Sequence, residues 1–184
     1  MSSSGEPEFV FAHRRTELRQ ELADFWAVHQ VLYRQEMQGF RSDTASGSGA
    51  AGEPRAQQPL RRQVAAISRD NQGAITGVVW VALRELEANW NPGSHAYFHR
   101  MYVVPSARCL RNSLPLYRVF LKGFQACGGK RDHRATALLA DNVNPGLQAA
   151  ALRRLFARSG FQLIGRNRLG SEIWYLPLTT TFVF

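Results

Sequence analysis

Apolar residues recur at three- and four-residue intervals in three stretches of the chain, and this spacing predicts three amphipathic helices. We expect these helices at residues 17–40, 114–127 and 146–159. Thr16 suits the N-cap of the first helix, and Gly160 follows the last run at the place where a helix commonly ends. Each segment therefore offers one apolar face for burial against the rest of the chain.

Short runs rich in β-branched and aromatic residues lie before, between and after these helices and predict seven strands. They occupy residues 8–12, 61–68, 74–86, 95–104, 135–140, 161–165 and 172–178. The turn residues 70–73 join two of these runs, which predicts a hairpin. The order of elements predicts an α+β fold with three or four helices around a twisted, mostly antiparallel sheet of six or seven strands. We expect its one parallel step across the helix at 146–159.

Residues 41–59 interrupt these patterns with a tract of Ser, Ala, Gly and Pro. Its apolar content is too low for a packed core, so we predict a flexible low-complexity loop. The 40 residues before it are too few to form a core alone. We therefore expect a single domain over residues 1–184, with this loop inside it.

Charge is distributed unevenly along the chain. The whole sequence carries 23 basic and 14 acidic residues, a formal charge of +9. Residues 1–60 hold six basic and eight acidic side chains, so residues 61–184 carry the entire excess of positive charge. This imbalance indicates an anionic partner for the last two thirds of the chain, without naming the anion.

Other patterns argue against several classes of protein. No apolar run approaches the length of a membrane span, and residues 1–8 lack the features of a secretory signal. The two cysteines, Cys109 and Cys127, form no CxxC pair, and the two histidines at HxxxH spacing, His95 and His99, lie in a predicted strand rather than a helix. We expect a cytoplasmic protein with reduced thiols, no metal site and no membrane contact.

Two stretches carry a resemblance to a known superfamily. The first is Met101–Arg108 (MYVVPSAR), and the second runs from Asn144-Pro145 to Leu155–Phe161 (LFARSGF) and Gly165. In this order and within this series of elements, they resemble the GNAT acyltransferase superfamily, enzymes that move an acyl group from coenzyme A to an amine. The resemblance covers residues 61–178 well and residues 8–40 weakly.

The resemblance implies a fold and a cofactor site. It implies that the central strands splay apart and that acetyl-CoA or another acyl-CoA is bound as co-substrate. An unpaired strand edge can bond the pantetheine arm, and the start of a helix can bind phosphate. The residues implied at this site are Tyr102, Val103, Val104, Arg108, Arg111, Asn112, Ser113 and Asn144.

The sequence departs from the superfamily in two places. Arg111 and Ser113 stand where the superfamily has the glycines of its phosphate loop. Phe156 stands where many members have a tyrosine that protonates the leaving thiolate, and phenylalanine has no proton to give. A domain that binds acyl-CoA or a partner without turnover is therefore one alternative function.

Direct attack of the amine in a ternary complex requires a group that removes the amine proton. We predict His99 as this base, with a structural strand histidine as the alternative. Glu85 and Glu87 are further candidates for the base. Asp141 is expected to orient the base or bind the amine, with a turn-stabilising aspartate as the alternative. Asn144, or a water on the backbone of residues 141–142, is expected to act in place of the missing tyrosine.

The basic charge leaves a second function open within the same fold. Aromatic residues alternate with Arg84 and Arg100, a pattern that can stack nucleic-acid bases. A GNAT-like enzyme that modifies nucleic-acid bases, as in bacteriophages, is therefore an alternative to one acting on a small or macromolecular amine. The aromatic residues 182–184 could pack against a second copy and form a homodimer.

Overall fold

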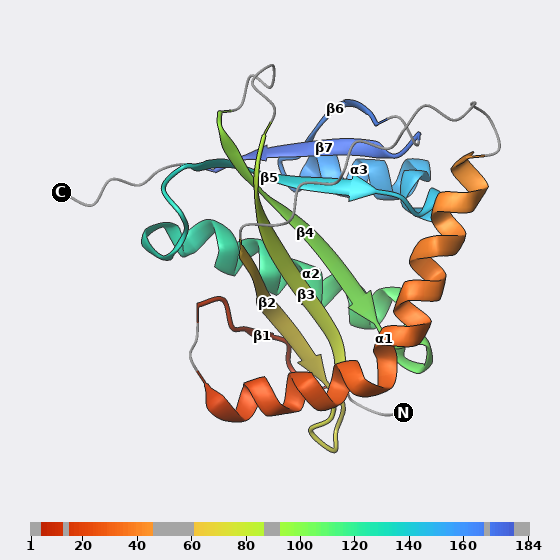
Figure 1. Cartoon of the computed structure of the whole chain (residues 1–184), viewed down its shortest axis with the longest axis vertical. Helices are drawn as coiled ribbons and strands as arrows, with labels where there is room; N and C mark the ends of the chain where they lie inside the picture. The colour runs from red at the N-terminus through yellow and green to blue at the C-terminus, as the bar shows by residue number, and fades with distance from the viewer. Residues whose placement is uncertain (1–4, 13–14, 46–60, 87–92, 168–169, 179–184) are drawn as a thin grey trace.

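The computed structural model describes residues 5–12, 15–45, 61–86, 93–167 and 170–178 (Figure 1). Within these ranges the chain forms three α-helices and seven strands, and the predicted α+β class is confirmed. In chain order the elements are β1 Glu8–Phe9, α1 Thr16–Ala45, β2 Arg61–Arg69, β3 Ile75–Glu85, β4 His95–Val103, α2 Leu110–Ala126, β5 Ala135–Asn142, α3 Ala150–Arg158, β6 Gln162–Arg166 and β7 Glu172–Pro177.

All seven strands form one sheet in the order β1-β2-β3-β4-β5-β7-β6. The predicted hairpin of β2 and β3 is confirmed, and every neighbouring pair is antiparallel except β4 and β5. The parallel step therefore crosses α2, and the expectation that it crosses the helix at 146–159 was wrong. β6 follows α3 in the chain but lies at the edge of the sheet, beside β7. The strand next to β5 is therefore β7, and this pair is antiparallel.

Several element boundaries differ from the prediction, and the last helix begins at Ala150 rather than at residue 146. α1 continues to Ala45, so the first five residues of the tract at 41–59 are helical and the predicted loop starts too early. Residues 46–60 lie outside the described ranges, as do the aromatic residues 182–184. α2 begins at Leu110, four residues before the predicted start, with Pro115 inside the helix.

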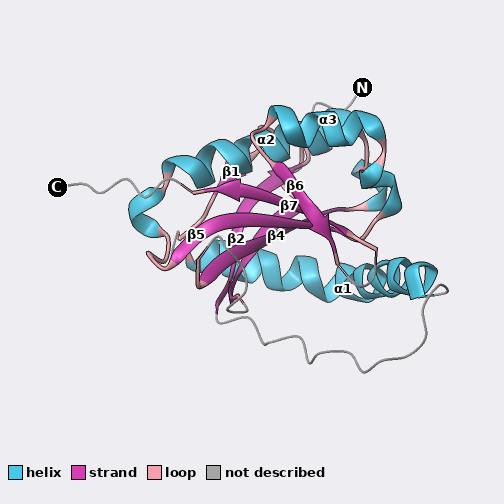
Figure 2. Cartoon of the chain, turned by 90° about the horizontal axis from the view of Figure 1, so that it is seen from above, coloured by secondary structure: helices cyan, strands magenta, loops and turns pink. Residues whose placement is uncertain are grey.

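Helices cover both faces of the sheet (Figure 2). α1 lies along one face, and α2 and α3 lie along the other. The α2 side holds the larger apolar cluster, in which Phe120 and Phe124 are fully buried against strand residues. β1 packs against α2 so closely that a Cβ atom at Gly123 would lie 2.3 Å from the Phe9 ring.

The two central strands separate toward their carboxyl ends. β4 and β5 pair from His95 to His99 on one strand and from Ala135 to Ala140 on the other. β4 then continues to Val103 while pairing only with β3 on its other side. Residues 100–103 therefore present toward β5 a backbone edge that is not paired with β5, as the resemblance implied.

Candidate active site

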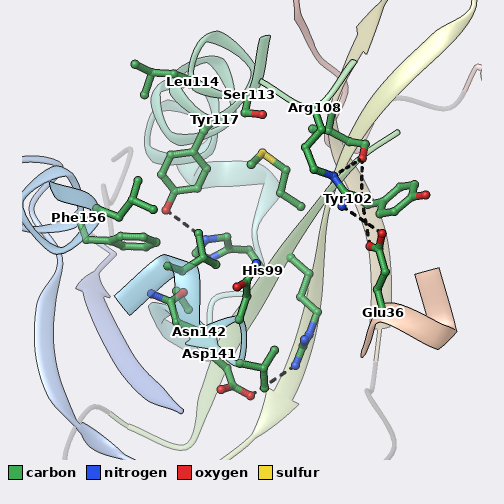
Figure 3. A pocket seen from close by; sticks show the side chains of 18 of the residues that line it. Glu36, His99, Tyr102, Arg108, Ser113, Leu114, Tyr117, Asp141, Asn142 and Phe156 are labelled. Atoms are coloured by element: carbon green, nitrogen blue, oxygen red, sulfur yellow. Dashed lines mark hydrogen bonds and ion pairs between the residues drawn. The ribbon is translucent and has the colours of Figure 1, made fainter. Parts of the chain in front are cut away.

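A cavity of about 430 Å³ opens where β4 and β5 separate (Figure 3). Its walls come from the second half of α1, the end of β4, the start of α2, the end of β5 and α3. The strand separation creates the opening, and the helices on both sheet faces close its sides. Figure 3 shows Tyr117 and Phe156 on one side of His99, and Tyr102, Arg108 and Glu36 on the other.

Arg108 lies at the edge of this cavity and is held by two acceptors. Its guanidinium donates to both carboxylate oxygens of Glu36, at 3.0 and 3.1 Å, in a bidentate pair. Its Nε and Nη2 also donate to the carbonyl oxygen of Val103, at 3.2 and 3.1 Å. The guanidinium also lies 5.7 Å from the Tyr102 ring centroid. An anion that binds Arg108 therefore has to compete with the Glu36 carboxylate.

Not all of the residues predicted for the cofactor line this cavity. Tyr102 and Val103 do, whereas Val104, Arg111 and Asn112 are not among the described residues that line it. Val104 donates its backbone N–H to the carbonyl oxygen of Thr76 at 2.9 Å. Ser113 lines the cavity, while Arg111 is exposed and the Asn112 side chain donates to the carbonyl oxygen of Ala107.

The start of α2 meets the cavity without a neutralising side chain. Its N-cap residue, Cys109, makes no side-chain cap, and the first turn contains no acidic residue. Leu110 and Leu114 line the cavity beside it. The partial positive charge of the helix start is therefore available to an anion.

His99 is buried on the α2 side of the sheet. Its Nδ1–H donates to the carbonyl oxygen of Leu139 at 3.0 Å, which leaves Nε2 to accept from the Tyr117 hydroxyl at 3.2 Å. Burial lowers the pKa of His99 from 6.5 to about 4 and raises the pKa of Tyr117 above its usual value. This environment favours a neutral, hydrogen-bonded imidazole over a base that titrates near neutral pH.

Asp141 and Asn144 also line the cavity. Asp141 Oδ2 accepts from Arg100 at 3.4 Å, and its Oδ1 accepts from the amide of Asn167 at 3.3 Å. Asn144 caps the 3-10 helix Pro145–Gln148 by accepting from the backbone N–H of Gly146 at 2.8 Å. Glu85, the other base candidate among the described residues, is exposed on β3, and Glu87 lies outside those residues.

Two residues of the cavity were missed by the sequence analysis. Asn142 is 3% exposed at the end of β5, and its Nδ2 has no hydrogen-bond partner among the described residues. A buried amide that lacks a partner is costly unless something else binds it. Tyr117 carries a hydroxyl beside Phe156, with ring centroids 5.8 Å apart. Neither residue stands out in the sequence, because Asn142 directly follows Asp141 and Tyr117 directly precedes Arg118.

The described residues contain no group of three His, Cys, Asp or Glu side chains that could hold a metal ion. In the same ranges, no helix is long and apolar enough to cross a membrane. Both cysteines are free.

No protein-family model matches the sequence, and no curated protein matches it either. The chain is similar in structure to a GNAT superfamily phosphinothricin acetyltransferase from Sinorhizobium meliloti in complex with acetyl-CoA, with 17% identity, a TM-score of 0.44, and 66% and 64% of the two chains covered. It is also similar to a GCN5-related N-acetyltransferase from Kribbella flavida, with 17% identity, a TM-score of 0.42, and 76% and 88% covered.

A GNAT family N-acetyltransferase from Escherichia coli in complex with CoA is similar at 15% identity and a TM-score of 0.42, with 62% and 58% covered. The match spans less than two thirds of the Sinorhizobium and Escherichia chains. These descriptions name the superfamily that the sequence motifs resemble. Likenesses of this size assign no activity, which has to be argued from the site.

Proposed function

We propose that this protein transfers an acyl group from acyl-coenzyme A to an amine, by direct attack in a ternary complex. The observation that carries the proposal is the cavity between the separated strands, which joins an unpaired strand edge to the buried amide of Asn142. A long thioester ligand needs both features: an edge along which its arm can bond, and a polar group at its reacting end.

The cofactor would lie with its diphosphate at the start of α2. Arg108 and Arg111 would bind the phosphate oxygens beside Asn112 and Ser113, whose own backbone N–H groups donate to the carbonyl oxygen of Cys109. The pantetheine arm would follow the backbone of residues 102–104 toward β5 and Asn144. Binding in this orientation requires Arg108 to leave Glu36, because its guanidinium donates hydrogen bonds to both Glu36 carboxylate oxygens.

The thioester carbonyl would accept a hydrogen bond from Asn142 Nδ2. As the amine attacks, a C–N bond forms and negative charge develops on this carbonyl oxygen. A donor held in place before the reaction stabilises that charge. Because Asn142 is buried and its Nδ2 has no partner among the described residues, binding the carbonyl would also satisfy this amide.

His99 would position the Tyr117 hydroxyl through Nε2 rather than act as the base, because its buried imidazole disfavours taking up a proton. The ammonium group would lose one proton to solvent before it attacks, and a second after the C–N bond has formed. The Tyr117 hydroxyl would pass this second proton to the thiolate as the C–S bond breaks. The Asp141 carboxylate, on the same cavity, would hold the incoming ammonium group before it loses its proton.

The test is release of coenzyme A thiol from acetyl-CoA in the presence of a panel of amines, with the amide product identified by mass spectrometry. A thermal-shift titration with acetyl-CoA in the same samples separates binding from turnover. Amine-dependent thiol release supports the proposal. Binding without turnover of any amine would favour the non-catalytic alternative, and absence of binding by folded protein would refute both.

A further inference from the structure

A second, smaller cavity of about 290 Å³ adjoins the first and is lined by four arginines. Arg34 comes from α1, Arg62 from β2, Arg84 from β3 and Arg100 from β4. No acidic side chain of the described residues contributes to its lining. The cavity therefore gathers part of the positive charge that the sequence concentrates after residue 60, on the α1 side of the sheet.

Strand register explains why these side chains meet. Arg62, Ala82 and Phe98 lie opposite one another across β2, β3 and β4 and so share a sheet face. Trp80 and Arg100 form the next row on that face. Ala82 is the smallest side chain among them, and the larger neighbours surround it. The result is a hollow with an apolar floor and a cationic rim.

The charges in this hollow are only partly balanced within the described residues. Arg100 reaches the Asp141 carboxylate at 3.4 Å, and the Arg84 guanidinium lies 5.0 Å from the Phe98 ring centroid. Neither Arg34 nor Arg62 forms an ion pair with any described residue. Like charges held close together repel, and an oxyanion bound among them would relieve that repulsion.

The two cavities share Tyr33, Met37 and Arg100. A molecule with its anionic group among the arginines can therefore extend past Arg100 toward Asp141 and the acyl-transfer cavity. We propose that the arginine cavity binds the carboxylate or phosphate of a compact amine acceptor and so directs its amine to the thioester. This inference rests on the proposed function and names the substrate class. The volume of about 290 Å³ is sufficient for a small anionic group.

The experiment measures binding by calorimetry with two matched pairs of amines. O-phosphoethanolamine is compared with ethanolamine, and 4-aminobutyrate with butylamine, so that phosphate and carboxylate are separated. The titrations use the wild type, Arg62→Gln, Arg84→Gln and a control, Arg154→Gln, which removes one positive charge from the exposed surface of α3. Acetyl-CoA is titrated into the same four proteins.

We expect at least one anionic amine to bind tenfold more tightly than its neutral partner. Arg62→Gln and Arg84→Gln should each weaken that binding at least fivefold, while Arg154→Gln and all acetyl-CoA affinities stay unchanged. The inference is overturned if neither anionic amine is preferred, or if Arg154→Gln has the same effect.

Two further results separate this inference from other accounts. If the wild type binds an anionic amine but does not bind acetyl-CoA, the proposed acyl transfer is refuted, whereas the arginine cavity is supported as an anion site. An oligonucleotide that binds through Arg62 and Arg84 and is not displaced by O-phosphoethanolamine would overturn the inference in favour of a nucleic-acid site.

Discussion

The protonation of His99 makes the stability of the fold depend on pH. The imidazole is buried and neutral, with a pKa lowered from 6.5 to about 4. The unfolded chain binds this proton more readily than the folded one. The contribution of His99 to the free energy of unfolding is therefore fully present above pH 6.5, and it is lost as the pH falls toward 4.

The two pKa values set the size of this effect. Between pH 7 and pH 5 the unfolded state gains most of a proton at this site, while the folded state gains almost none. The free energy of unfolding should therefore fall by about 2 kcal/mol over this range from His99 alone. The full loss below pH 4 is about 3 kcal/mol, from about 1.4 kcal/mol for each unit of pKa difference.

The assay is urea unfolding of the wild type and of His99→Gln at pH 7 and pH 5. His99→Gln removes the titrating group and keeps a side chain that can form hydrogen bonds, so other titrating groups contribute equally to both proteins. We expect the wild type to lose about 2 kcal/mol more than the variant over this interval. Equal losses in the two proteins would refute a buried, neutral His99.

Three further predictions address the cavity and the packing around it. Asn142→Ala should lower kcat by about 100-fold with little change in the KM for acyl-CoA, measured by thiol release, because it removes the proposed carbonyl donor. Glu36→Gln should lower the KM for acyl-CoA about threefold in the same assay, because a partly exposed ion pair with Arg108 is worth about 1 kcal/mol or less. Gly123→Ala should lower the free energy of unfolding by about 1–3 kcal/mol in urea, because its Cβ overlaps the Phe9 ring. An unchanged kcat in Asn142→Ala would contradict the role of Asn142 as carbonyl donor. An unchanged KM in Glu36→Gln would contradict competition between Glu36 and the cofactor for Arg108, and an unchanged free energy of unfolding in Gly123→Ala would contradict the close packing at Phe9.

Local patterns in the sequence were enough to predict the elements and the fold class. Apolar spacing located the helices, and β-branched runs located the strands, because burial of one face dominates both. The ends were less accurate. Residues 41–45 lack the apolar residues on which the prediction depended, yet they continue α1. The position of the parallel step depended on which strand takes the sheet edge, and local spacing does not specify that.

The candidate site was predicted only in part, because its properties depend on contacts between distant residues. His99 was chosen for the usual pKa of histidine, but the pairing with Tyr117 and Leu139 joins three elements and changes its chemistry. Arg108 was expected to face a phosphate, and its bidentate pair with Glu36 spans 72 positions of the chain. The arginine cavity likewise depends on the register of β2, β3 and β4, which local sequence patterns do not specify.

The central claim is that acyl-CoA binds where β4 and β5 separate, and a crystal structure of the acetyl-CoA complex tests it most directly. We predict a diphosphate bound to Arg108 at the start of α2, and a pantetheine arm along residues 102–104. The thioester oxygen should lie within hydrogen-bond distance of Asn142 Nδ2. Coenzyme bound elsewhere on the molecule, or a cavity still empty at saturating acetyl-CoA, would contradict the account.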